Sequence, residues 1–276
     1  MAMDGNATGG LPRFSVGTVI RASLAVLRAN AWTFLGIILG VGLPAGLLLM
    51  VAVVGLAGGQ SPSISLENAS GNQILALIIV GLVGMIAYFL ILTALTFGAL
   101  QSLRGRKAGI GACLSHGLSA LPRAVLAGLI FSVVMGLTAF VVSWVVGAVT
   151  GHGALAGIVL MAVFAFVVVV FWVFLPVVVV ERVGPIDCFF RSNTLTKGHR
   201  WSILGILGLV VAANLIAKLF AMGLGAIGAP AASGVLDFAA SLFFLALGAV
   251  LAAVGYYLLR AEKEGFAEDD LVKVFD

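Results

Sequence analysis

The sequence predicts an all-α integral membrane protein with six transmembrane helices, arranged as three parallel hairpin repeats that are each preceded by a cytoplasmic amphipathic helix. The 276-residue chain is 62% hydrophobic and only 9% charged, whereas soluble domains carry about 25% charged residues. Too few polar side chains remain to cover a water-soluble body of this length, so lipid must cover much of the surface. The apolar runs are long and aliphatic, which favours helices over a β-barrel.

The placement of positive charge predicts the orientation of the chain. Of the 15 Lys and Arg residues, all except Lys218 lie in segments 1–30, 101–123, 181–201 and 260–276. Cytoplasmic segments are enriched in Lys and Arg, so we expect these four segments, with both termini, on the cytoplasmic side. The same rule explains the net charge of +4 without nucleic acid as a partner, since no basic run is interleaved with stacking aromatic residues.

Residues 1–30 are predicted to form a cytoplasmic tail followed by an amphipathic helix. Ser15 can cap a helix over residues 16–30, whose apolar side chains fall on one arc with Arg21 and Arg28 beside it. Such a helix either lies in the membrane surface or packs on the protein's own cytoplasmic face, and both arrangements bury the same stripe.

The membrane domain is assigned to residues 31–259 and the charged cytoplasmic tail to residues 260–276. Trp32 marks the interface at which the first span begins. A second amphipathic segment precedes the third span, and Pro122 should end it. The predicted spans are residues 31–56, 74–100, 124–149, 155–180, 202–224 and 235–259.

The segment 184–201 precedes the fifth span and is basic and partly amphipathic. Pro185 is expected at the first position of a short helix, and Gly198 is placed to stop that helix. Trp201 then anchors the next span at the interface.

The first and third units of the chain agree in detail, whereas the middle unit shares only the apolar stripe. Because each unit enters the membrane from the cytoplasm, the repeats are expected to be parallel. Arg28 corresponds to Lys197, and Ser23, Trp32, Leu35, Gly36 and Ile37 have the spacing of Ser192, Trp201, Leu204, Gly205 and Ile206.

Ionisable residues inside the membrane are the default functional candidates, because burying a charge in lipid is costly. Lys218 lies toward the outer side of the fifth span, and Asp237 lies at the outer end of the sixth. His152, in the outer turn between the third and fourth spans, could approach the same level. These residues form either a polar outer vestibule that binds a headgroup or ion, or a structural ion pair beside a solvated histidine; we favour the structural pair.

The sequence contains no recognisable catalytic set, and we expect neither enzymatic activity nor a bound metal or cofactor. Cys113 and Cys188 lie in predicted cytoplasmic segments, so both should be reduced thiols. Neither has a Cys or His neighbour at metal-ligand spacing, and no phosphate-binding or dinucleotide-binding glycine motif follows a strand.

The run VVVVERVGPIDCFFRSNTLTKGHRWSILGILGLV, residues 177–210, resembles a signature of a bacterial family of six-span proteins. That family comprises the membrane domain found with some glycerophosphodiester phosphodiesterases and related inner-membrane proteins. In it, a turn with a small residue and Pro precedes an RS..LT.G.RW helix that enters a span. The resemblance implies a multi-pass protein of the bacterial inner membrane. It implies no agreed molecular function, because the catalytic barrel of the phosphodiesterases is a separate soluble domain. The turn contains Pro185, and the matching helix residues are Arg191, Ser192, Leu195, Thr196, Gly198, Arg200 and Trp201.

These observations favour a non-enzymatic inner-membrane protein that supports a membrane complex or organises lipid. Its expected partners are membrane lipids, together with a membrane protein or a second copy of the chain. The alternative is a transporter or channel for a small or amphiphilic solute, although the spans hold few polar side chains. A lipid-modifying enzyme is the least favoured class, because it would need residues such as His199, Asp187 and Glu181 around one pocket.

Overall fold

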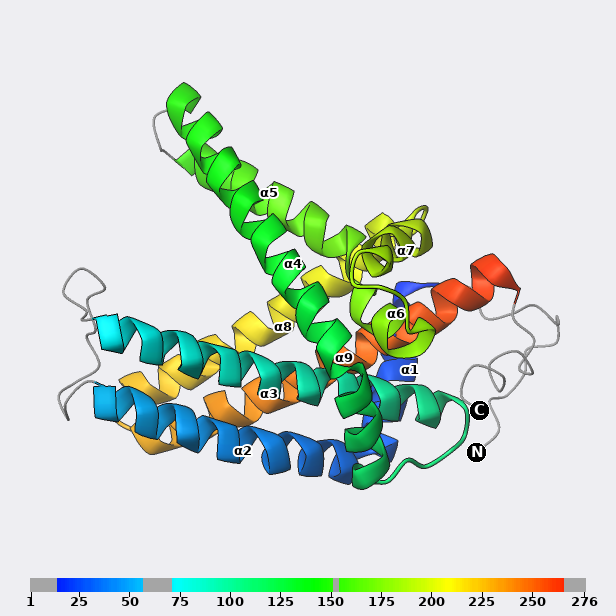
Figure 1. The fold of residues 1–276 in the computed structure, drawn as a ribbon, viewed down its shortest axis with the longest axis horizontal. Coiled ribbons are helices and arrows are strands. Elements are labelled where there is room, and N and C mark those ends of the chain that lie inside the picture. The colour runs from blue at the N-terminus through cyan, green and yellow to red at the C-terminus, as the bar shows by residue number, and fades with distance from the viewer. Residues whose placement is uncertain (1–13, 57–70, 151–153, 266–276) are drawn as a thin grey trace.

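The computed structural model describes residues 14–56, 71–150 and 154–265, and every regular element in these ranges is an α-helix (Figure 1). Six helical segments are long and apolar enough to cross a membrane. The predicted all-α class is therefore confirmed for the described residues, and so is the presence of six helical segments with the length and hydropathy of membrane spans. His152 lies outside the described residues.

Five of the predicted spans each lie within one described helix, the fourth is divided between two helices, and short helices precede the first and fifth spans. Their bounds are α1 (Val16–Ala29), α2 (Ala31–Leu56), α3 (Gly71–Leu103), α4 (Ile110–Thr150), α5 (Ala154–Val170), α6 (Phe174–Glu181), α7 (Asp187–Thr196), α8 (Arg200–Ala226) and α9 (Pro230–Glu264).

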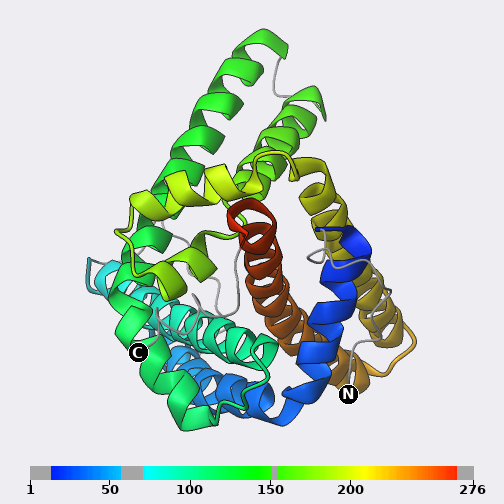
Figure 2. The same ribbon diagram turned by 90° about the vertical axis from the view of Figure 1, so that its right-hand side faces the viewer.

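Three pairs of consecutive long helices lie side by side, namely α2 with α3, α4 with α5, and α8 with α9, and α4 also packs against α3. In Figure 1 the α4–α5 pair points away from the other two pairs, and all three pairs meet at one end of the molecule. The short helices α1, α6 and α7 gather at that end around the last turns of α9, and we call it the base. Figure 2 looks onto the base and shows α9 at its centre.

Helix α9 is the central helix of the molecule. Of its most apolar window 44% is buried inside the protein, against 22% or less in each of the other five candidate spans. Tyr256 and Leu259 near its end are fully enclosed, and α9 packs against α1, α3, α6, α7 and α8. The base is therefore assembled around the C-terminal turns of α9.

Helix α1 buries one face against the protein. Ser15 caps it as predicted, because its Oγ accepts a hydrogen bond from the Thr18 backbone N–H at 3.2 Å. Val19 and Val26 are buried, whereas Arg21 and Arg28 are exposed. The apolar stripe thus lies on the protein, mainly along α9.

Pro122 does not end a helix as predicted, because α4 runs through it. A proline inside a helix removes one backbone hydrogen bond and bends or breaks the helix according to its surroundings. Here Ala120 and Ala124, on either side of it, are buried at 3% and 0% exposure. Packing of both flanking turns holds the helix together, so the amphipathic segment and the third span form one continuous helix.

The fourth span, in contrast, is broken where the sequence predicted one helix. α5 ends at Val170 and α6 begins at Phe174. Pro176 cannot donate a hydrogen bond to the carbonyl of Trp172, which lies four residues earlier. In a regular α-helix the Phe174 N–H would donate to the Val170 carbonyl. Here it donates to the Phe171 carbonyl at 3.1 Å instead, so the Val170 carbonyl lacks its helical donor.

The boundaries of α7 were predicted correctly at one end only. Pro185 was expected at the first helical position, but α7 begins at Asp187. The Cys188 N–H donates to the Gly184 carbonyl at 3.2 Å, so Pro185 lies within the turn that leads into the helix. At the other end Gly198 has φ +96°, the left-handed conformation in which glycine is favoured, and α7 ends just before it as predicted.

Candidate functional site at the base

Two hydroxyls of α7 occupy the break between α5 and α6. Ser192 Oγ donates to the Val170 carbonyl at 3.0 Å, and Thr196 Oγ1 lies 3.2 Å from the same oxygen. Both side chains are fully buried, and Leu195 between them is 1% exposed. Spacings of three and four residues put all three on one face of α7. This part of the motif therefore docks α7 onto a carbonyl that the broken helix cannot satisfy itself.

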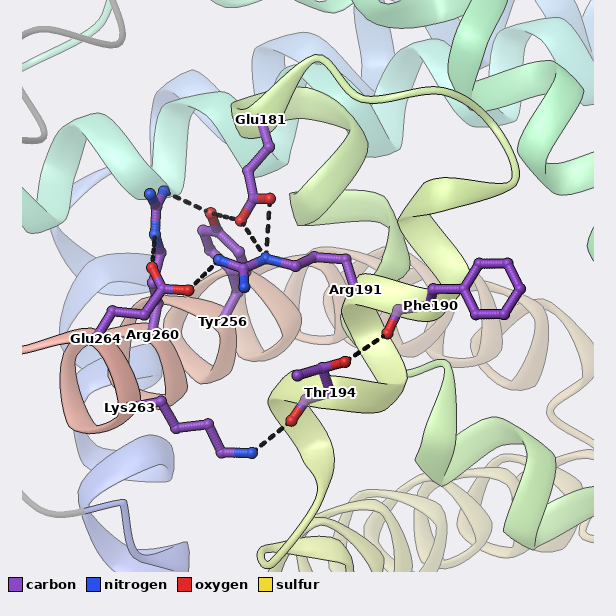
Figure 3. Close-up of polar contacts among 8 residues, drawn as sticks. All are labelled: Glu181, Phe190, Arg191, Thr194, Tyr256, Arg260, Lys263 and Glu264. Atoms are coloured by element: carbon purple, nitrogen blue, oxygen red, sulfur yellow. Dashed lines mark hydrogen bonds and ion pairs between the residues drawn. The ribbon is translucent and has the colours of Figure 1, made fainter.

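Arg191, next to Ser192 on α7, contributes to a ring of polar side chains, drawn in Figure 3. Glu181 at the end of α6 accepts hydrogen bonds from Arg191 Nε, at 3.0 and 3.1 Å to its two oxygens. Its Oε1 also accepts from the Tyr256 hydroxyl at 2.9 Å. One carboxylate thereby links α6, α7 and α9.

Two residues of α9 close this ring. Arg260 donates through Nη1 to the Tyr256 hydroxyl at 2.8 Å and through Nε to Glu264 Oε2 at 3.0 Å. The other oxygen of Glu264 pairs with Arg191. We call Glu181, Arg191, Glu264, Arg260 and Tyr256 the base ring; its four charged side chains are between 13% and 28% exposed. Partial burial strengthens such charge-assisted bonds relative to fully solvated ion pairs.

The last turn of α9 makes two further connections at the base. Lys263 Nζ donates to the carbonyls of Thr194 and Lys197 at 2.5 and 2.7 Å, which neutralises the negative end of α7. Glu262 accepts a hydrogen bond from the Phe14 N–H at 2.9 Å and lies 3.5 Å from His199 Nε2. The end of α9 thus holds the segments that precede α1 and α8 as well as α7.

Three predicted interfacial side chains lie on the surface of the base. Trp32 and Trp201 are 85% and 86% exposed, and Arg28 is exposed. Every described Lys and Arg except Lys218 comes from the short helices, from chain segments and helix ends at the base, or from the first half of α4. The predicted grouping of basic residues is therefore also a grouping in space.

A mainly apolar cavity lies on the side of α7 away from the base ring. Its volume is about 430 Å³, and it lies between α4, α5 and α7 with Arg200, the first residue of α8, at its polar end. Arg200 Nη2 donates to Asn193 Oδ1 at 2.6 Å, and its guanidinium lies over the Phe166 ring at 5.4 Å.

At the other end of the long helices, the structure brings two of the three predicted outer residues together. Lys218 Nζ lies 2.9 Å from Asp237 Oδ1, and the two side chains are 51% and 49% exposed. His152 is outside the described residues, so only the pair belongs to the observed site.

Two residues of the lipid-modifying hypothesis, Glu181 and His199, have different partners. Glu181 is part of the base ring, whereas His199 pairs with Glu262. In the described ranges, no three His, Cys, Asp or Glu residues are grouped as metal ligands. Cys188 Sγ donates to the Pro185 carbonyl at 3.2 Å; burial, with the adjacent Asp187 charge, raises the pKa of this thiol to about 12.

Sequence reasoning missed the contribution of α9 to the base. Tyr256, Arg260 and Glu264 follow one another at spacings of four residues, which places them on one helix face. That spacing was a readable signal. The hydrogen bond from Tyr256 to Glu181 could not be recognised in the sequence, because it joins residues 75 positions apart.

Comparisons of the chain with protein-family models, with curated proteins and with solved structures found no match.

Proposed function

We propose that this polytopic membrane protein is a non-enzymatic component of the bacterial inner membrane that organises anionic lipid around its base, alone or as part of a membrane complex. One observation carries the proposal: basic side chains and the exposed Trp32 and Trp201 gather at the same end of the molecule. Basic groups near a membrane surface attract anionic lipids, and tryptophan favours the level of the headgroups.

The proposed orientation places the base and both termini in the cytoplasm. Basic segments are retained on the cytoplasmic side during insertion, and the cytoplasmic leaflet carries the anionic surface that such a base would contact. Lys218 remains at the opposite end, where the nearby carboxylate of Asp237 balances its charge.

The proposal includes the internal repeat of the first and third units, each a short helix followed by a pair of spans. It is supported by the equal environments of corresponding residues. Ser23 and Ser192 are both fully buried, Trp32 and Trp201 are both exposed, and Ile37 and Ile206 are both fully buried.

The proposal also retains the relationship to the membrane domain of the phosphodiesterase family. Its support is that the residues carrying the resemblance have specific contacts. Ser192 and Thr196 bind the free Val170 carbonyl, Arg191 enters the base ring, and Gly198 adopts positive φ.

Native mass spectrometry of the protein extracted with its own lipids tests the proposed function. We expect anionic phospholipids to copurify and to be reduced in a Trp32→Ala/Trp201→Ala double variant. Trp144→Ala is the matched control, because Trp144 is also exposed, at 69%, but lies toward the outer end of α4. A protein that stays folded without associated lipid or partner would contradict the proposal.

The transporter alternative rests on the Lys218–Asp237 pair between α8 and α9. Solute flux into proteoliposomes that is abolished by Lys218→Met or Asp237→Asn, with unchanged insertion, would favour it over a lipid-organising role.

A further inference from the structure

The cavity beside α7 has a rigid aromatic wall. Phe131 of α4 stacks on Phe189 of α7 with ring centroids 6.3 Å apart. Phe171, just after α5, meets Phe189 edge-on with ring centroids 5.2 Å apart. Phe174, the first residue of α6, stacks on Phe189 with ring centroids 5.5 Å apart. Aromatic pairs at these distances hold one another in place. The wall is therefore built before any ligand arrives, which lowers the entropic cost of binding.

The rim of the cavity is apolar and exposed. Phe190 is 70% exposed and Phe166 is 57% exposed, although both line the cavity. In Figure 3, Phe190 extends from α7 to the side opposite Arg191 and the base ring. An apolar chain in the surrounding membrane can thus enter from the side, between α7 and the α4–α5 pair, without crossing the base.

The polar end of the cavity carries an incompletely satisfied cation. Arg200 Nη2 donates to Asn193, but its Nε is buried and has no hydrogen-bond partner in the described part of the chain. A buried guanidinium N–H without an acceptor is costly, and a phosphate or carboxylate is the acceptor whose geometry fits an arginine fork.

The charges near Arg200 favour a ligand with net negative charge. Lys197 and Arg200 each act electrostatically on Lys263, as does the Glu262 carboxylate with the opposite sign. Among the described residues, Arg200 has no carboxylate partner within salt-bridge distance. A zwitterionic headgroup would bring a second cation into this surrounding, whereas an anionic headgroup would not.

We infer that the cavity binds one acyl chain of an anionic glycerophospholipid, with the lipid phosphate on Arg200. The volume of about 430 Å³ falls within the range of about 300–1,000 Å³ typical of small-ligand sites. The neighbouring Trp201, 86% exposed, marks the headgroup level at which Arg200 would meet a phosphate. This inference rests on the proposed lipid-organising function and assigns it a lipid class and a site.

The test is titration of the delipidated, detergent-purified full chain with dioleoyl phosphatidylglycerol, followed by native mass spectrometry. We expect one tightly retained lipid, and weaker retention of dioleoyl phosphatidylcholine. Arg200→Gln should raise the Kd for phosphatidylglycerol about tenfold or more, as expected when a charge-assisted hydrogen bond is lost. Lys218→Gln removes the same charge at the other end of the molecule and should leave the Kd unchanged.

A second pair of variants tests the cavity independently of charge. Val134→Trp places a large ring in a lining position and should also weaken retention. Leu137→Trp is its control, because Leu137 lies on the same helix and is 60% exposed outside the cavity. Thermal unfolding of each variant establishes that it is folded.

The outcomes separate the site from the broader function. If phosphatidylglycerol binds equally to the wild type, Arg200→Gln and Val134→Trp, the assigned site is wrong while a lipid-organising base stands. If the wild type retains no lipid, both proposals fail. Preference for phosphatidylcholine, or retention of free oleate but not of the phospholipid, overturns the assignment to an anionic glycerophospholipid.

Discussion

The base ring and the outer Lys218–Asp237 pair use the same chemistry in different settings. The ring joins α6, α7 and α9 through side chains that are 13–28% exposed, and two of its contacts connect residues 73 and 75 positions apart. The outer pair joins residues 19 positions apart through one bond between half-exposed side chains. The comparison indicates that polar contacts organise the tertiary structure at the base, whereas Lys218 and Asp237, at the opposite end of the long helices, join two neighbouring helices.

The largest effect on stability is expected from replacing Arg191, which pairs with both acidic residues of the base ring. Arg191→Ala leaves Glu181 and Glu264 without their common partner. Loss of hydrogen bonds to charged, partly buried groups should lower the free energy of unfolding by about 1.5–3 kcal/mol. Chemical denaturation in detergent measures this change. Arg21→Ala is the control, since Arg21 is exposed on α1; equal effects of the two substitutions would mean that the ring adds nothing to stability.

The second effect concerns the docking of α7 on the broken helix. Ser192→Ala and Thr196→Val each leave the other hydroxyl to serve the Val170 carbonyl. The double variant leaves that carbonyl unsatisfied and should cost about 1–3 kcal/mol, more than the sum of the single variants. Thr194→Val is the matched control, because the Thr194 hydroxyl bonds an exposed carbonyl within α7. Additive single effects would show that the two hydroxyls do not share one acceptor.

Much of this molecule follows from local sequence signals, because length, hydropathy and capping act within one segment. The six spans, the Ser15 cap and the Gly198 stop belong to this group. Pro122 and Pro176 differ: one is accommodated inside α4 and the other accompanies the break before α6. A proline removes the same hydrogen bond in both cases, and the outcome depends on packing that the local sequence does not contain.

The candidate site was predictable in its parts but not in its assembly. The motif residues of α7 were recognised, yet their contacts depend on a free carbonyl at Val170 and a carboxylate at Glu181. The central position of α9 was also not predictable, because its apolar composition resembles that of the other spans. Only burial distinguishes it.

The third expected effect is a pH dependence of stability that arises from Cys188, and measuring it tests whether the base excludes water around α7. Burial and the Asp187 charge raise the pKa of Cys188 from 9.0 to about 12, so the folded state holds the thiol proton more tightly than the unfolded state. Between pH 9 and 12 the unfolded chain binds fewer protons at this site, so stability falls as pH rises, by up to about 1.4 kcal/mol per pH unit. The Cys188→Ala variant should lack this part of the pH dependence when thermal unfolding is followed from pH 7 to 10.

Thiol labelling provides the matching kinetic measurement. A water-soluble maleimide should modify Cys188 at pH 7 only after unfolding, because the reactive form is the thiolate and the buried thiol remains protonated. Rapid labelling of the folded Cys113→Ala variant, in which Cys188 is the remaining thiol, would show that water reaches this side of the base.

The smallest effect is expected at the outer pair, and it completes the comparison. Lys218→Met removes a cation whose side chain is 51% exposed and keeps a side chain of similar aliphatic length. Ion pairs at exposed sites contribute about 0–1 kcal/mol, so the free energy of unfolding should change by less than about 1 kcal/mol, well below the effect of Arg191→Ala. Asp237→Asn should give the same small change, and the double variant should show little coupling. A decrease in the free energy of unfolding as large as that of Arg191→Ala would mean that Lys218 and Asp237 interact away from water. This pair would then cross-link helices as strongly as the base ring does.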